Sequence, residues 1–248
     1  MIRILRPFDP HRIRLLVFDL DGTLIDSRLD LIHSVNATMR HIGRPELPGD
    51  VIASYVGDGA PALIRRALGQ PDPIDSNDAG LDASAEASFR SALDYFLGYY
   101  RLHKLDHTTV YQGMMETLAR LSHSSNGTQR LMAVLTNKPV NPSRAIVSAL
   151  GLAEFFARVY GGNSFATKKP DPLGVRTILQ ETGVPPAEAL MIGDSAIDVL
   201  TGSNAGLYTC GVTYGFAPHT LEQVTPDVTV DEPLELAQFL GSKLQSST

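Results

Sequence analysis

Short apolar runs alternate with segments of helical periodicity along most of this 248-residue chain. The apolar runs cover residues 15–18, 131–135, 189–192 and 207–212, and a shorter strand is predicted at 158–160. Such short runs, bounded by turn residues, are typical of buried strands in a parallel sheet. Helical patterns are predicted at 113–121, 142–150, 172–182, 233–240 and from residue 195 to about 204. This alternation predicts an α/β fold, a three-layer core with helices on both faces of a parallel sheet.

The interval from residue 27 to residue 107 interrupts the alternation. Apolar residues recur there at helical spacing, and helices are predicted at 27–42, 47–55, 60–68 and around 89–100, with no convincing strand. The polar stretch 70–80, which contains Pro71, Pro73, Asn77 and Gly80, is predicted to be a loop. We therefore expect an inserted all-helical domain at 27–107 and a core made of 1–26 and 108–248. Residues 1–12 are expected to form a loosely packed leader, and the tail after Gly241 is expected to fray.

Charge and composition exclude several classes of protein. The net charge is −6 and the basic residues are dispersed, so no nucleic-acid footprint is visible. No apolar run approaches the roughly 18 residues of a membrane span, and no signal-peptide core is present. Cys210 lies alone in an apolar run and is expected to be buried. We expect a cytoplasmic monomer or homodimer that acts on a small molecule and binds neither nucleic acid nor membrane.

Polar clusters follow three of the predicted strands. They are Asp19 with Asp21, Thr136-Asn137, and Gly193-Asp194-Ser195. Because the carboxyl ends of parallel strands meet at one edge of a sheet, these clusters are expected to converge. The segment Lys168-Lys169-Pro170-Asp171-Pro172 precedes a helix and can reach the same edge. Each cluster alone could be an ordinary turn, but their combination favours an active site.

Two carboxylates close together indicate a bound cation and two different catalytic roles. Asp19 and Asp21 are two residues apart and would share one face of a continuing strand. They repel each other unless a cation lies between them or one carries a proton. This favours phosphoryl transfer, in which one carboxylate attacks phosphorus and the other transfers protons. Mg²⁺, a lysine, a hydroxyl and backbone N–H groups would neutralise the phosphoryl oxygens, and Asp19 and Asp194 suit Mg²⁺.

Four motifs together resemble those of the haloacid dehalogenase superfamily, in its phosphatase branch. They are Asp19-Leu-Asp-Gly-Thr-Leu24, Thr136-Asn137, Lys169-Pro-Asp-Pro172 and Gly193-Asp-Ser-Ala-Ile-Asp198, in the family's order. The resemblance implies a Rossmann-like core with a movable helical cap inserted after the first motif. It also implies that Asp19 is the nucleophile and Asp21 the acid/base. Mg²⁺ would be held by Asp19, by the backbone carbonyl of Asp21 and by Asp194.

The same resemblance assigns the remaining polar residues of the motifs. Thr136 would bind phosphate with help from Asn137, and Lys169 would bridge the phosphate and the nucleophile. Asp198 would orient Lys169 or a metal-bound water. The hydroxyls of Thr23 and Ser195 would support these groups from behind.

Three further segments are similar to bacterial phosphoglycolate phosphatases. They are 55–68 in the helical insertion, Gly161-Gly-Asn-Ser164 and Gly211-Val-Thr-Tyr-Gly-Phe216. This implies that Gly57, Asp58 and Gly59 face the substrate, with Asp58 standing where asparagine is common. Arg65 and Arg66 are expected on an exposed helix face.

Other activities on the same core stay open at this point. The substrate could be another small phosphate, such as a sugar phosphate, a nucleotide or pyrophosphate. A phosphomutase uses the same core, and a catalytically idle binding module could share the fold. A dehalogenase is disfavoured because it does not need the acid/base Asp21.

Overall fold

The computed structural model describes residues 1–71, 83–122 and 129–241, and the chain divides into two compact units. The first unit comprises Met1–Asp26 with Val110–Thr248, and the second comprises Ser27–Thr109. Most of the loop expected at 70–80 and the tail after Gly241 lie outside the described residues.

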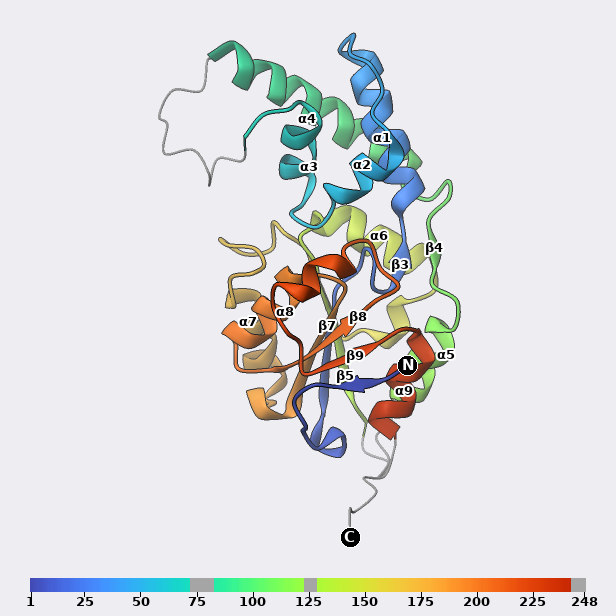
Figure 1. The fold of residues 1–248 in the computed structure, drawn as a ribbon, viewed down its shortest axis with the longest axis vertical. Helices are drawn as coiled ribbons and strands as arrows, with labels where there is room; N and C mark the ends of the chain where they lie inside the picture. The colour runs from blue at the N-terminus through green and yellow to red at the C-terminus, as the bar shows by residue number, and fades with distance from the viewer. Residues whose placement is uncertain (72–82, 123–128, 242–248) are drawn as a thin grey trace. The chain divides into compact units, whose positions relative to one another are not determined.

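A seven-stranded sheet forms the centre of the first unit (Figure 1). Its strands are β1 (Arg3–Ile4), β2 (Leu15–Phe18), β5 (Leu131–Leu135), β6 (Arg158–Tyr160), β7 (Ala189–Gly193), β8 (Tyr208–Val212) and β9 (Val228–Val230). Their order across the sheet is β1-β9-β8-β7-β2-β5-β6. All neighbouring pairs are parallel except β1 with β9. The strand β2, which carries the first motif, thus lies between β7 and β5.

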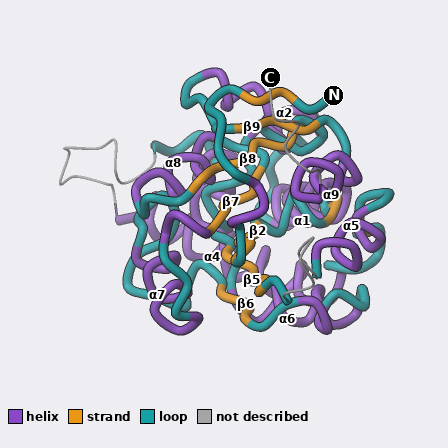
Figure 2. Tube along the Cα trace, turned by 90° about the horizontal axis from the view of Figure 1, so that it is seen from below, coloured by secondary structure: helices purple, strands orange, loops and turns teal. Residues whose placement is uncertain are grey.

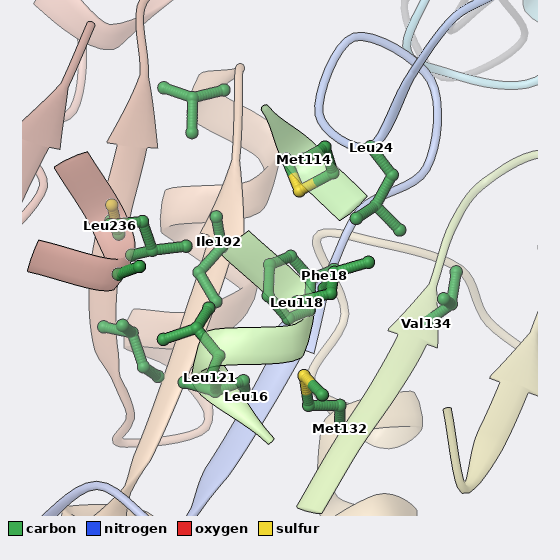
Figure 3. Packing of buried hydrophobic residues seen from close by; sticks show 14 of the residues in the cluster. Leu16, Phe18, Leu24, Met114, Leu118, Leu121, Met132, Val134, Ile192 and Leu236 are labelled. Carbon is green, nitrogen blue, oxygen red and sulfur yellow. The ribbon is translucent and has the colours of Figure 1, made fainter. Parts of the chain in front are cut away.

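Successive residues of each strand point to opposite faces of the sheet, and both faces are buried. Leu16 and Phe18 belong to one apolar cluster, whereas Leu15 and Val17 belong to the other. Figure 3 shows the first cluster, in which Phe18 and Ile192 lie beside Leu118. Burial on both sides explains why these strands read as continuous apolar runs in the sequence.

Helices cover each face, and Figure 2 shows them around the strands. The helices α5 (Met114–Leu121), α6 (Val140–Ala149) and α9 (Pro233–Gly241) contribute apolar side chains to the first cluster. The helix α7 (Leu173–Thr182) contributes to the second cluster. The helix α8 (Ala196–Asn204) packs on β7 and β8, where an added Cβ at Gly202 would meet Met191. The three-layer α/β architecture predicted from the sequence is confirmed.

The first twelve residues correct the prediction of a loosely packed leader. Arg3 and Ile4 form β1 and pair with Thr229 and Val228 of β9, a strand that the sequence pattern did not reveal. The terminal amine also forms an ion pair with Asp231 at 2.6 Å. The strand β1 has only two residues, both exposed, so it leaves no hydrophobic pattern to read.

The second unit consists of helices within its described residues. They are α1 (Arg28–His41), α2 (Gly49–Ser54), α3 (Ala60–Ala67) and α4 (Ala83–His103). The helix α4 packs along α1, and the ring of Phe96 stacks on that of Tyr100 inside the unit. None of the described helices is long and apolar enough to cross a membrane.

Arg65 corrects one expectation about the second unit. Its side chain is buried, forms an ion pair with Glu86 at 2.9 Å and lies over the ring of Phe89 at 3.7 Å. The guanidinium is therefore a packing element and is not on an exposed helix face. Strands β3 (Ile25–Asp26) and β4 (Thr109–Val110) lie where the chain passes between the units, and they pair with each other.

Candidate active site

Three neighbouring strands bring the predicted polar clusters to one edge of the sheet. Phe18, the last residue of β2, is in register with Val134 of β5 and with Ile192 of β7. The next residues of these strands lead directly into Asp19, Thr136 and Asp194. The clusters converge because β2, β5 and β7 are parallel and adjacent at the centre of the sheet.

A tight turn directly after β2 holds the first two aspartates. The amide of Asp19 donates to the carbonyl of Ile192, and the amide of Leu24 donates back to Leu20 at 2.9 Å. Gly22 has a φ of +80°, a conformation that L side chains rarely adopt. A Cβ at Gly22 would also lie 2.3 Å from Oδ2 of Asp194, so this turn requires glycine.

Lys169 lies between two carboxylates at the centre of the site. Its Nζ is 2.8 Å from Oδ1 of Asp19 and 2.6 Å from Oδ1 of Asp198. All three side chains are buried. Burial by itself lowers the pKa of Lys169, but the two carboxylates outweigh it and raise that pKa above its usual value. The lysine therefore stays charged next to the predicted nucleophile.

Asp198 is fixed by the start of helix α8. Its Oδ2 accepts hydrogen bonds from the amide of Ser195 at 3.2 Å and from Oγ of Ser195 at 2.7 Å, in a capping box. A Cβ at Gly193 would lie 2.1 Å from Cγ of Asp198, so only glycine allows this close approach. Ser195 and Asp198 thus form a rigid support for Lys169.

Asp194 is held by backbone amides of a loop after β8. Its Oδ2 accepts hydrogen bonds from the amides of Phe216 at 2.6 Å and Ala217 at 3.2 Å. A Cβ at Gly215 would lie 2.4 Å from the same oxygen. The sequence singled out the segment that ends at Phe216 but did not reveal that its amides position Asp194.

The carboxylates of this site are placed so that they could hold a cation. Oxygens of Asp19, Asp194 and Asp198 all lie within 4.8 Å of one another. Burial, followed by the neighbouring carboxylates, raises the pKa of Asp194 to about 8. Burial also raises the pKa of Asp19 to about 6, although Lys169 opposes this shift. Buried carboxylates that resist ionisation in this way fit a divalent cation, which would supply the missing positive charge.

These raised pKa values predict how pH changes the effect of a bound divalent cation on the stability of the folded protein. Asp19 and Asp194 retain protons in the folded, metal-free protein that an unfolded aspartate loses near its ordinary pKa of 3.8. Their contribution to folding stability therefore falls as pH rises from about 4 to about 8. A divalent cation held by these residues would bind the ionised carboxylates, so it should stabilise the folded protein more at high pH. We expect the Tm difference between Mg²⁺-saturated and chelated protein to be larger at pH 8.5 than at pH 6; a larger difference at pH 6 would contradict this account.

Thr136 and Asn137 lie at the end of β5 as predicted, and both are buried. The hydroxyl of Thr136 accepts a hydrogen bond from the amide of Lys138 at 3.3 Å. The amide nitrogen of Asn137 donates to the carbonyl of Lys169 at 3.2 Å, so it ties the strand end to the lysine loop. Thr23 is fully buried, and its Oγ1 has no hydrogen-bond partner among the described residues.

Lys138 is a residue of this site that the sequence analysis missed. Its Nζ lies 2.8 and 2.9 Å from the two carboxylate oxygens of Asp21, and its side chain is only 6% exposed. The sequence feature that could have revealed it is its position, directly after a Thr-Asn pair at the end of a strand. The described site thus contains four carboxylates and two ammonium groups.

The segment Gly57-Asp58-Gly59 belongs to the second unit. Nη2 of Arg66 donates to Oδ2 of Asp58 at 2.5 Å, and Nη1 donates to the carbonyl of Tyr55 at 3.0 Å. The charge of Asp58 is therefore paired within its own unit. Gly57 has a φ of +130° and Gly59 a φ of +87°, so both positions favour glycine.

The sequence matches a family model described as haloacid dehalogenase-like hydrolase over residues 16–212. It is 36% identical over 230 residues to the phosphoglycolate phosphatase of Vibrio parahaemolyticus, covering 92% of this chain and 96% of that protein. It is 37% identical over 221 residues to the phosphoglycolate phosphatase of Pseudomonas putida, covering 88% of this chain and 76% of that protein.

Solved structures show the same architecture. A crystal structure of a predicted phosphoglycolate phosphatase from Haemophilus somnus superposes with a TM-score of 0.79 at 29% identity, covering 92% of this chain and 97% of that one. A haloacid dehalogenase-like family protein from Streptococcus pneumoniae superposes with a TM-score of 0.76 at 21% identity, covering 92% and 98%, and supports the fold. The chain belongs to the haloacid dehalogenase-like hydrolases. Within them it is a phosphatase of the phosphoglycolate phosphatase-like kind.

Proposed function

We propose that this protein is a Mg²⁺-dependent phosphomonoester hydrolase that forms an aspartyl-phosphate on Asp19 and acts on 2-phosphoglycolate. The observation that carries the proposal is the position of Lys169 between Asp19 and Asp198. This arrangement holds a carboxylate beside a charged lysine at the edge of the sheet, with Asp194 close by. A binding module without catalysis would not need two buried lysines paired to separate aspartates.

The proposed cation site uses oxygen ligands, which suit Mg²⁺. Asp19, Asp194 and the backbone carbonyl of Asp21 would hold the ion. When bound, Mg²⁺ supplies positive charge that neutralises the phosphoryl oxygens. Asp198 and Ser195 support Lys169 from behind, and the unpartnered hydroxyl of Thr23 lies within the same turn as Asp21.

In the first step, a carboxylate oxygen of Asp19 attacks phosphorus. The bond between phosphorus and the ester oxygen breaks, and its electron pair leaves with that oxygen, which takes a proton from Asp21. Lys169 and Thr136, with Asn137, would bind the phosphoryl oxygens. The nucleophile is held in place by Lys169 at 2.8 Å.

In the second step, water attacks the phosphorus of the aspartyl-phosphate. Asp21 takes a proton from that water, the bond between phosphorus and the Asp19 oxygen breaks, and inorganic phosphate leaves. The proton that Asp21 gave up in the first step is thus recovered in the second. Asp19 returns to its carboxylate form, so the cycle closes.

We propose that Lys138 positions Asp21 for both steps. Replacing Lys138 with methionine should lower kcat by roughly 10-fold to 100-fold, less than the loss of acid–base catalysis itself, with little change in KM. Because the two side chains act as a pair, adding Lys138→Met to Asp21→Asn should cause little further loss. Arginine at position 138 should retain part of the activity. Additive losses in the double variant would show that Lys138 acts elsewhere.

The substrate proposal rests on the relatives and on the helical unit, which we propose to be a movable cap. The curated relatives at 36–37% identity are named phosphoglycolate phosphatases. We propose that Gly57 and Gly59 let backbone N–H groups approach the substrate carboxylate. Asp58 would not repel that carboxylate strongly, because Arg66 pairs with it.

Two variants test this loop. Asp58→Asn should leave kcat/KM for 2-phosphoglycolate within about threefold of the wild type or raise it, because a paired negative charge is removed. Gly57→Leu should impair 2-phosphoglycolate more than acetyl phosphate, because a side chain at a φ of +130° distorts the loop. Loss of all activity in Asp58→Asn would give Asp58 a direct role. If neither variant changes the activity on either substrate, another part of the proposed cap determines substrate choice.

The deciding experiment is a turnover assay over a panel of phosphorylated metabolites. We expect kcat/KM to be highest for 2-phosphoglycolate among sugar phosphates, nucleotides and pyrophosphate. A higher value for another phosphate would keep the hydrolase and reject the substrate. Transfer of labelled phosphate to a second hydroxyl of the sugar, without release of inorganic phosphate, would indicate a phosphomutase. We further propose that the protein works in the cytoplasm as a monomer or homodimer.

A further inference from the structure

Four of the seven histidines in the chain belong to the helical unit. His41 stacks on Tyr95 and His103 stacks on Tyr99. His33 and His107 instead meet edge to face, with ring centroids 5.1 Å apart. Both are exposed, and in the described chain neither ring takes part in a hydrogen bond. Their ring nitrogens are therefore available to a ligand.

A carboxylate lies beside these two rings. Asp30 is three residues before His33 on α1, so the two side chains share one face of the helix. One carboxylate oxygen of Asp30 and one nitrogen from each ring all lie within 4.8 Å of one another. Ligands of a tetrahedral Zn²⁺ ion are about 3.3 Å apart, given bonds of roughly 2.0–2.1 Å. Small rotations of the two exposed rings would bring their nitrogens to the separation that a tetrahedral ion requires.

Asp30 is already held in a fixed orientation. Its side chain is buried, and its Oδ2 accepts hydrogen bonds from the amide of Thr108 at 2.9 Å and from the hydroxyl at 2.6 Å. Its Oδ1 accepts from the amide of His107 at 2.9 Å. A carboxylate oxygen can accept a second bond, so Oδ1 retains a lone pair. Hydrogen bonds that orient a ligating carboxylate are a common feature of metal sites.

A pocket of about 160 Å³ lies next to this cluster. Asp30, His33, His103 and Asp106 are among its lining residues, so it is open to water beside the candidate ligands. Arg40 also lines the pocket but is paired with Glu46. The pocket thus provides room for water to complete the coordination of an ion, and its lining contains three carboxylates and one guanidinium.

We propose that Asp30, His33 and His107 bind a divalent transition-metal ion, for which Zn²⁺ is the probe. Two imidazoles and one carboxylate form a ligand set that suits Zn²⁺ and not Mg²⁺, which prefers oxygen ligands. This site is separate from the aspartate cluster of the active site. It connects the first turn of the helical unit to its last residues, so a bound ion would fasten the two ends of that unit. The proposal does not depend on which phosphate ester the enzyme hydrolyses.

The test is a Zn²⁺ titration of the full-length protein, prepared without a histidine tag and kept in millimolar Mg²⁺ to occupy the active site. Competition with a fluorescent chelator gives Kd and stoichiometry. We expect one Zn²⁺ per chain in the wild type. His33→Ala and His107→Ala should each weaken Kd by about tenfold or more. His41→Ala, on the same helix, and His219→Ala, in the other unit, are matched controls and should bind as the wild type does.

A second readout separates binding from folding. Zn²⁺ should raise the Tm of the wild type and of both controls, because a ligand of the folded state stabilises it, and should not raise that of His33→Ala or His107→Ala. Asp30 is left intact, since its removal would leave the buried amide of Thr108 without its partner. Equal Kd values and equal Tm shifts in all variants would overturn the proposal. So would a wild type that binds no Zn²⁺ below millimolar concentration.

Discussion

Asp19→Asn should abolish turnover and leave the protein folded. An amide is nearly the same size as a carboxylate but does not attack phosphorus, so kcat should fall roughly 10⁴-fold or more. Stability should change little, because Lys169 keeps its contact with Asp198 at 2.6 Å. An amide also avoids the burial cost that raises the pKa of Asp19 to about 6. Steady-state release of phosphate and a thermal melt measure both effects.

Two comparisons make the Asp19 result specific. Glu154→Gln removes an exposed carboxylate from the same unit and should retain wild-type turnover. A rapid acid quench with labelled substrate should trap phosphate on wild-type protein and none on Asp19→Asn. If Asp19→Asn keeps more than a tenth of wild-type turnover, the nucleophile is another residue.

Removal of divalent cations should have the second large effect. The described site holds Asp19, Asp21, Asp194 and Asp198 against two lysines, so a phosphate dianion would meet excess negative charge. Excess chelator should lower turnover by at least about 100-fold, because the transition state gathers further charge on the phosphoryl oxygens. Mg²⁺ added beyond the chelator should restore the rate.

The chelation experiment needs a check on folding. The chelated protein should keep a cooperative melt, since Lys169 and Lys138 already pair with carboxylates of the site. Dialysis that removes the chelator together with the metal should leave the enzyme inactive until Mg²⁺ returns. Full activity in excess chelator would remove the cation from the mechanism and assign charge neutralisation to the two lysines alone.

The sequence by itself determined the fold class and the helical insertion. Buried parallel strands such as Leu15–Phe18 are apolar on both faces, and this leaves a continuous run that can be read without coordinates. The edge at which Asp19, Thr136 and Asp194 meet followed from the same reading, since parallel strands end together. The edge strand β1 was missed because its two exposed residues carry no readable period, and the neighbouring strand β9 was missed with it.

Only the tertiary structure decided which charges are paired. Lys138 and Asp21 are 117 positions apart, and nothing in the local pattern of either shows that they meet. The sequence also did not reveal that the amides of Phe216 and Ala217 donate hydrogen bonds to Asp194. Nor did it reveal that Arg66 pairs with Asp58. Hydrophobic burial is a property of one segment and its period, so sequence reveals it. An ion pair depends on two side chains reaching the same point, which only the packed chain defines.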